Sequence, residues 1–219
     1  MYGIRIFFEK VGVARYISHL DLMRNFERAM RRADIPFWYT EGFNPRPFLT
    51  FALPLSLGVA GKCEVVDIRL VEDMTFEEVR SRLNAALPDG IKVLRIAEPV
   101  KKPKEIAASE YTITMTDIGD AQSVCEKLEA FLQQESIVTV KLNKRKKPVE
   151  TEIKRFIHGF SVEQMNDAVV LKVTLASGCT DNCNPALVLD AFKEQCGVDN
   201  MYCDIVRERV LDGEMHEFE

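Results

Sequence analysis

The period of the hydrophobic residues changes within residues 2–33, YGIRIFFEKVGVARYISHLDLMRNFERAMRRA. Residues 2–10 are rich in Ile and Phe and alternate between apolar and polar positions, which indicates a half-buried strand. In residues 18–33 the apolar positions recur every three or four residues, which indicates an amphipathic helix. The chain is therefore expected to begin with a strand followed by such a helix.

The same pattern reading extends through the first hundred residues. Pro54 predicts that the second extended segment below lies at a sheet edge or forms a bulge. After the first strand and helix we expect extended segments at 36–41 and 48–59, a strand at 62–72, a helix at 75–87 and a strand at 90–100. The resulting order, β-α-β-β-α-β, is that of the ferredoxin-like unit.

The second half repeats this order after a charged, proline-bearing segment at 101–109, KKPKEIAAS, which reads as a linker. Pro185 near the start of the last helix and Gly197 just past its end follow the usual asymmetry of helix ends. The elements expected are strands at 110–117, 136–143, 167–177 and 201–211 and helices at 120–134 and 185–197. We therefore predict an α+β fold of two tandem ferredoxin-like halves, 1–100 and 110–219, each an antiparallel sheet with helices on one face.

Composition narrows the classes of protein. The chain has 219 residues and a formal net charge of −5, so binding of nucleic acid must be inferred from local clusters of basic residues. No apolar run approaches the length needed to span a bilayer, and the first ten residues lack the layout of a signal peptide. We expect a cytoplasmic protein with no membrane partner.

Cofactor and enzyme signatures are sparse. Cys179 and Cys183 have a spacing seen in some metal sites, but no second close Cys or His pair follows, and a radical-SAM iron–sulfur cluster would need a third nearby cysteine. Dinucleotide, P-loop, zinc-protease and serine-hydrolase motifs do not occur. We predict no metal and no cofactor, and leave open whether the chain is an enzyme, with a non-catalytic partner of an enzyme favoured.

The helix at 18–33 presents two different faces. Ser18 and Asp21 form a capping-box-like start, in which the hydroxyl accepts a backbone N–H and the acid favours the positive helix end. One face is apolar, and the opposite face carries Arg24, Arg28, Arg31 and Arg32. Arginine suits planar recognition of phosphate or carboxylate, although solvated helix faces are also often charged. Both interpretations of this face stay open.

His19 falls in the apolar sector of the same helix, at its first turn. Such a histidine is usually a hydrogen-bonded core residue. At a helix N-terminus the dipole disfavours the imidazolium, so a neutral ring able to act as general acid or base is the alternative.

The loop TEGFNPRPF at 40–48 is built to hold one shape. Gly42 allows positive φ, and the prolines on either side of Arg46 fix its backbone, with Asn44 as a nearby amide. Aromatic residues beside a fixed arginine form a surface suited to stacking of a base or a cofactor, here Trp38, Tyr39 and Phe43. The alternative is a connecting loop whose aromatics cover the core.

A second basic run lies at 141–155, between strands of the second half, and is predicted to form a basic hairpin or flap. Its central residues are Lys144, Arg145, Lys146 and Lys147. Such runs bind phosphate backbones by charge, and they also occur as ordinary exposed loops.

The stretch from Ser18 to Pro47 resembles a bacterial family of radical-SAM-associated proteins, found beside or fused to the C-terminus of a B12-binding-type radical SAM protein. The matching motifs are SHLD, the arginine-rich helix and EGFNPRP, followed by the strand that contains CEVVDIRL. The resemblance implies a radical SAM partner but no chemistry, and the usual gene neighbours of the family imply an RNA or translation setting. A looser likeness to tandem ferredoxin-like RNA-processing proteins of the CRISPR endoribonuclease type rests on element order and His19 alone.

Three functions follow as hypotheses. The first is an accessory module that binds RNA or another anionic substrate for a radical SAM enzyme, through the arginine helix face, the loop at 40–48 and the lysine flap. The second is a metal-independent RNA-processing or RNA-modifying enzyme, with His19 as general acid or base and Arg46 stabilising charge. The third is a pure protein-interaction module.

Overall fold

The computed structural model describes residues 1–142, 148–178, 181–198 and 200–219. These residues form two compact units, unit 1 with Met1–Glu105 and Phe218–Glu219, and unit 2 with Ile106–Glu217. The boundary between the units lies inside the segment predicted as a linker.

Unit 1 follows the β-α-β-β-α-β order. Its strands are antiparallel neighbours in the order β4, β1, β3, with β2 paired to β3. The elements are β1 (Tyr2–Lys10), the 3-10 helix η1 (Gly12–Tyr16), α1 (His19–Arg32), β2 (Leu49–Phe51), β3 (Ala60–Leu70), α2 (Phe76–Ala86) and β4 (Ile91–Ala97). Together with unit 2 they confirm the predicted α+β class.

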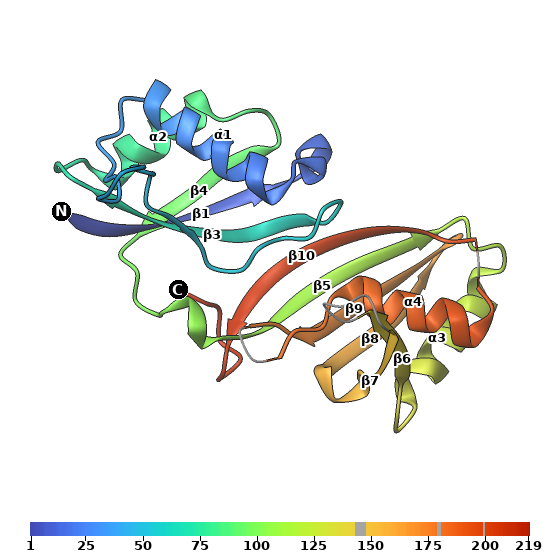
Figure 1. Cartoon of the computed structure of the whole chain (residues 1–219). Coiled ribbons are helices and arrows are strands. Elements are labelled where there is room, and N and C mark those ends of the chain that lie inside the picture. Colours follow the sequence, from blue (N-terminus) through green and yellow to red (C-terminus); the bar gives the residue numbers. More distant parts are fainter. Residues whose placement is uncertain (143–147, 179–180, 199) are drawn as a thin grey trace. The chain divides into compact units, whose positions relative to one another are not determined.

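The core of unit 1 lies between the sheet and its two helices. Figure 1 shows α1 and α2 side by side on one face of β4, β1 and β3. Alternate residues of β1, Ile4, Ile6 and Phe8, are buried against Phe26 of α1 and its neighbours. The rings of Phe8 and Phe26 meet edge to face at 4.9 Å between centroids. The period-2 strand and the 3.6-period helix thus bury their apolar positions against each other, as the sequence predicts.

Lys10 connects β1 to the turn that leads into α1. Its side chain is buried, and Nζ donates hydrogen bonds to the carbonyl oxygens of Arg15, at 3.2 Å, and Ile17, at 2.8 Å. A buried ammonium is tolerated only where such acceptors surround it. The contact fixes η1 and therefore the position at which α1 starts.

Unit 2 repeats the order with one insertion. Its main sheet is antiparallel, in the order β10, β5, β9, β8, and β6 and β7 pair in a separate two-stranded sheet. After η2 (Pro103–Glu105) the elements are β5 (Ile106–Thr116), α3 (Ala121–Gln133), β6 (Val138–Leu142), β7 (Pro148–Glu152), η3 (Lys154–Phe156), β8 (Ile157–Met165), β9 (Ala168–Ala176), α4 (Pro185–Cys196) and β10 (Tyr202–Asp212). Pro185 and the left-handed Gly197 delimit α4 as predicted.

Three boundaries differ from the prediction. The linker ends earlier, because 106–109 is already strand and Ala108 and Ser109 are buried between β9 and β10. The segment 136–143 supplies β6 of the hairpin, and the strand beside β9 is β8, which the sequence pattern missed. Among the described residues β8 pairs on one side only and is largely exposed, so its sequence IHGFSVEQM lacks a hydrophobic period. In the first half, β2 covers only part of the extended segment 48–59.

Candidate functional site

Helix α1 starts at the predicted cap. Ser18 Oγ accepts a hydrogen bond from the backbone N–H of Asp21 at 3.2 Å and donates one to its carboxylate at 2.7 Å. The hydrogen bond from Ser18, and then the one from Arg24, hold the pKa of the Asp21 carboxyl below its usual value. The cap begins the helix at His19 and so sets which residues face outward.

Replacing Ser18 with Ala is expected to lower the free energy of unfolding by about 1 kcal/mol, because an N–H of the first turn loses its acceptor. Urea unfolding followed by circular dichroism measures this. Leu20→Ala is the control, since Leu20 is exposed on the same turn and its loss should change stability by less than about 0.5 kcal/mol. Equal effects of the two substitutions would contradict the capping role.

The helix arginine face consists of Arg24, Arg28, Arg31 and Arg32, which are all exposed, as predicted. Arg24 pairs with Asp21 at 3.0 Å, and Arg31 pairs with Glu27 at 2.6 Å. Arg32 donates to the carbonyl oxygen of Ala86 at 2.6 Å.

Within the described part of the chain, the Arg28 guanidinium makes no hydrogen bond or ion pair. It is therefore the residue of this face most available to an external anion.

The loop predicted to be rigid is the end of a short hairpin. Thr40 N donates to the carbonyl oxygen of Arg46 at 2.8 Å, and Phe48 N donates to that of Trp38 at 3.0 Å. Arg46 N also donates to the Thr40 hydroxyl at 3.1 Å. These bonds close the hairpin around residues 41–45.

The loop tip, residues 41–46, lies in solvent. Gly42 has a φ of 127°, a conformation that favours glycine, as the sequence predicts. Asn44 and Arg46 are exposed, and the Arg46 guanidinium has no partner among the described residues. Phe43 is 106% exposed, so its ring makes no contribution to the core. The tip therefore presents an aromatic ring, an amide and an unpaired guanidinium together.

Trp38 is placed differently from Phe43. Its ring is half-buried and packs against Phe48 at 5.8 Å between centroids. The guanidinium of Arg69, on β3, lies 5.3 Å from the Trp38 ring and 4.5 Å from the Phe48 ring. Trp38 thus anchors the base of the hairpin to the sheet, whereas Phe43 is free at the tip.

Tyr39 joins the hairpin to the helix arginine face. Arg31 Nε donates to the Tyr39 hydroxyl at 3.0 Å, and the guanidinium lies 5.7 Å from the centre of the ring. The sequence suggested Tyr39 only as one of the aromatics of a stacking surface and suggested no role for Arg69, because residues on a predicted strand carry no signal of which partner they meet across space. The hydrogen bond and the ring contact of Arg31 with Tyr39 connect the base of the hairpin to the helix arginine face.

His19 lies at the start of α1 and packs against the β2 strand. Its ring meets that of Phe51 edge to face at 5.2 Å between centroids, and the side chain is half-buried. Phe51 in turn contacts Phe8 and Phe26 of the core. Among the described residues, no hydrogen bond or ring contact joins His19 to Asn44 or Arg46. The contacts of His19 are those of a residue at the margin of the core.

The basic run falls on the β6–β7 hairpin of unit 2. Its central residues, Lys144, Arg145, Lys146 and Lys147, lie outside the described residues. On the stem, Glu152 accepts hydrogen bonds from Ser136 and from the backbone of Ile137 and Lys154, which lower the pKa of its carboxyl. Arg155 stacks on Phe156 at 4.6 Å.

Two further findings concern metals and membranes. Within the described ranges, no group of three or more His, Cys, Asp or Glu side chains is arranged to hold a metal ion, and Cys183 is buried while Cys179 lies outside those ranges. In the part of the chain that the structure describes, no helix has the length and apolar character to cross a membrane.

Comparison with solved structures gives the fold. A chain of a Cbf5–Nop10–Gar1 complex is similar over 95% of this chain and 49% of its own length, with a TM-score of 0.55 and 14% sequence identity. This chain therefore spans about half the length of that one, and the likeness shows the fold alone. An unknown protein from Galdieria sulphuraria matches 94% of this chain and 98% of its own, with 12% identity and a TM-score of only 0.27.

Comparison of sequences gives the family. No curated protein matches the chain. A family described as an uncharacterised protein conserved in bacteria, DUF2344, matches residues 3–185, which include α1, the hairpin and the loop tip. This chain belongs to that family.

Proposed function

We propose that the protein is an accessory module that binds RNA for a radical SAM enzyme, with the loop tip and the helix arginine face as its contact surface. A nucleotide base would stack on Phe43, and phosphates would be bound by Arg46 and Arg28. The same chemistry would accept another anionic, aromatic substrate.

The observation that carries this proposal is the complete exposure of Phe43. A phenyl ring held in water adds nothing to folding, and here it stands on a hairpin closed by two backbone hydrogen bonds. Aromatic rings displayed beside arginine are the usual means of binding unpaired bases without sequence readout. The amide of Asn44, two residues before Arg46, adds a donor and an acceptor for a base edge.

The electrostatics support the same ligand class. The chain as a whole is acidic, with a net charge of −5. Two guanidinium groups without partners among the described residues, Arg28 and Arg46, therefore stand out as local anion sites. Arginine binds phosphate through two parallel hydrogen bonds, which is stronger and more directional than a lysine contact.

The radical SAM partner is proposed from the SHLD and EGFNPRP motifs, which resemble those of proteins encoded beside or fused to radical SAM enzymes. Co-expression of this chain with such an enzyme tests it. We expect the two to co-purify, and failure to do so at low salt would contradict the partnership while leaving RNA binding intact.

Fluorescence anisotropy of a labelled single-stranded RNA tests the binding surface. Phe43→Ala is expected to weaken binding about 10-fold, because one stacked base is lost. Arg46→Ala is expected to weaken it and to reduce the slope of log K against log salt by about one unit, because one phosphate contact is lost.

The matched controls are Leu57→Ala and Arg80→Ala. Leu57 is another exposed apolar residue of unit 1, and Arg80 is an exposed arginine paired with Glu77 on α2. Neither should change affinity by more than about 2-fold. If the wild-type chain binds no RNA at low salt, or if the controls weaken binding as much as the loop-tip variants, the proposed surface is wrong.

A further inference from the structure

The face of the unit 1 sheet opposite α1 and α2 carries three arginines. Arg5 pairs in register with Asp67, which stands two residues before Arg69 on β3. Phe7, two residues after Arg5, pairs in register with Arg95 on β4. Because side chains alternate along a strand, these five side chains project from one face, and together they are named the sheet platform.

Each arginine of the sheet platform lies on an aromatic ring. The guanidinium of Arg95 is 3.6 Å from the centre of the Phe7 ring, and that of Arg69 is 4.5 Å from the centre of the Phe48 ring. The guanidinium of Arg5 is 4.5 Å from the centre of the Phe218 ring. Bases of single-stranded nucleic acid stack on aromatic rings and on guanidinium planes, so a sheet face that carries both has suitable groups once Phe218 leaves Arg5.

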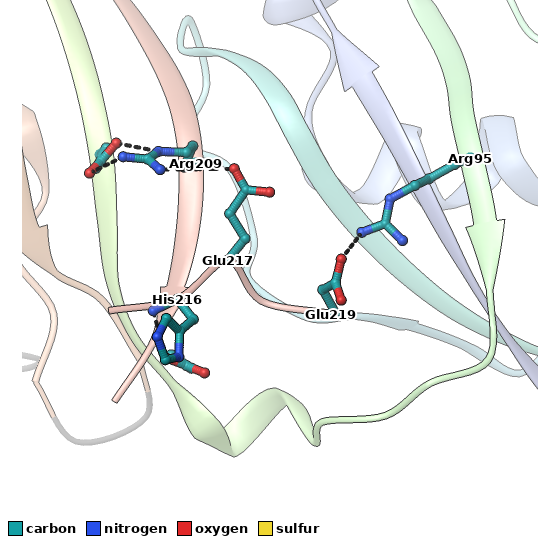
Figure 2. Close-up of polar contacts among 7 residues, drawn as sticks. Arg95, Arg209, His216, Glu217 and Glu219 are labelled. Carbon is teal, nitrogen blue, oxygen red and sulfur yellow. Dashed lines mark hydrogen bonds and ion pairs between the residues drawn. The ribbon is translucent and has the colours of Figure 1, made fainter. Parts of the chain in front are cut away.

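Phe218 and Glu219 contact the sheet platform although they are remote from it in sequence. The Phe218 side chain is 3% exposed, against Arg5. Glu219 Oε1 lies 3.1 Å from Arg95 Nη2, as Figure 2 shows, and the Glu219 carbonyl oxygen accepts a hydrogen bond from Lys101 N. The Phe218 ring on Arg5 resembles a stacked base, and the Glu219 carboxylate on Arg95 resembles the phosphate of a nucleotide.

The residues that precede Phe218 in the chain form a turn at the end of β10. Asp212 Oδ1 accepts hydrogen bonds from the backbone N–H groups of Glu214 and His216, both at 2.9 Å. The backbone of Glu217 then forms an antiparallel β-bridge with Leu211. The Oε1 atom of Glu217 lies 3.9 Å from Nη1 of Arg209, and Figure 2 shows the two side chains. The turn therefore orders the backbone from Asp212 to Glu217.

The contacts of Glu219 are weak enough to be exchanged. The side chains of Arg95 and Glu219 are 46% and 61% exposed. Ion pairs with this exposure contribute little stability because water and salt screen them. A backbone phosphate of RNA also carries a negative charge and two free oxygens, so it can form a bidentate pair with Arg95 and compete with the carboxylate.

Arg5 retains an unused donor beneath Phe218. It is 1% exposed, and its Nε and Nη2 donate to the Asp67 carboxylate at 2.7 and 2.8 Å. Nη1 is buried and has no hydrogen-bond partner among the described residues. Buried donors are nearly always paired, so this one indicates a place for an acceptor oxygen of a ligand.

We propose that the sheet platform is a second binding site for a nucleotide of single-stranded RNA, and that Phe218 and Glu219 occupy it in the free protein. The base would replace the Phe218 ring on Arg5, and its phosphate would replace the Glu219 carboxylate on Arg95. The inference rests on the proposed function for the class of ligand, but it uses a different set of residues from the loop tip.

Glu219→Gln is the direct test, measured by anisotropy of the same labelled RNA. Removing the competing carboxylate is expected to tighten binding about 3- to 10-fold, because the site is then free in a larger fraction of molecules. Glu77→Gln is the control, since it removes an exposed carboxylate from another arginine pair, on α2. Glu77→Gln changes the net charge by the same amount as Glu219→Gln, and it should tighten RNA binding by less than half as much.

Arg95→Ala completes the experiment as a double-mutant cycle. Arg95→Ala alone should weaken binding about 5-fold more than Arg80→Ala, and Glu219→Gln should have no effect in the Arg95→Ala background. Equal effects of Glu219→Gln and Glu77→Gln, or a Glu219→Gln effect that persists without Arg95, would overturn the inference. Phe218→Ala provides a second release variant, and its melting temperature shows whether it remains folded.

The outcomes also separate this inference from the proposed function. If Phe43→Ala and Arg46→Ala weaken binding while the cycle shows no coupling, the loop-tip proposal stands and the sheet platform is wrong. If the cycle shows coupling while the loop-tip variants bind normally, the sheet platform stands and the loop tip is wrong. If neither the wild-type chain nor any variant binds RNA, the loop-tip proposal and the sheet-platform proposal are both wrong.

Discussion

Replacing Asp67 with Ala is expected to lower the free energy of unfolding by about 3 kcal/mol, because it leaves a charged guanidinium buried without its carboxylate. Arg5 is 1% exposed, and its bidentate pair with Asp67 supplies the only hydrogen bonds that the described residues make to its side chain. Urea unfolding monitored by circular dichroism gives the free-energy difference.

Two variants decide the cause of the effect. Glu77→Ala removes the carboxylate of an exposed arginine pair and should lower the free energy of unfolding far less than Asp67→Ala does. Arg5→Met combined with Asp67→Leu removes both charges and should recover most of the stability lost in Asp67→Ala. If the double variant is as unstable as Asp67→Ala, packing and not an unpaired charge explains the loss.

Replacing Phe26 with Ala is expected to have a similar or larger effect, about 3–5 kcal/mol, because a large cavity would open in the core of unit 1. The Phe26 ring is fully buried and meets the rings of Phe8 and Phe51 edge to face, at 4.9 and 5.6 Å. Phe51 also holds the His19 ring, so the loss should release the start of α1. Thermal and urea unfolding measure the change.

Phe26→Leu and Met23→Ala are the informative comparisons for this second prediction. Leucine keeps much of the buried volume, so Phe26→Leu should cost less than half as much. Met23 lies on the same helix and is only half-buried, so Met23→Ala should also lower the free energy of unfolding less than Phe26→Ala does. A Phe26→Ala effect no larger than that of Met23→Ala would show that the aromatic cluster is not the stabilising core.

The surface proposed for RNA could be predicted in part from the sequence. Gly42 and the two prolines around Arg46 indicated a shaped loop, and the helical period separated the exposed arginines from Phe26. The sequence did not separate Trp38 from Phe43, since both are aromatic residues near the same loop. In the structure one packs on Phe48 and Arg69, and the other is fully exposed. That difference depends on which strand the hairpin base meets, and spacing along the chain carries no such information.

The sequence pattern misassigned strands in unit 2 where, within the described ranges, a strand pairs with a neighbour on one side only. Strand β8 has little hydrophobic period because among the described residues it pairs only with β9, whereas the β6 segment has a clear pattern and was assigned to the main sheet. Local patterns report how much of a strand is buried, but they do not report which strand is its neighbour.

The sequence by itself determined the α+β class, the β-α-β-β-α-β order of unit 1, the cap and the two faces of α1, and the conformation of Gly42. Each of these follows from interactions between residues close in the chain, such as Ser18 with Asp21. Only the tertiary structure decided that Arg5, Arg69 and Arg95 share one face with their aromatic rings, and that Phe218 and Glu219 lie on it. Those contacts join residues that are far apart in the sequence, and the alignment of the arginines on one face arises from the register of β1 with β3 and β4.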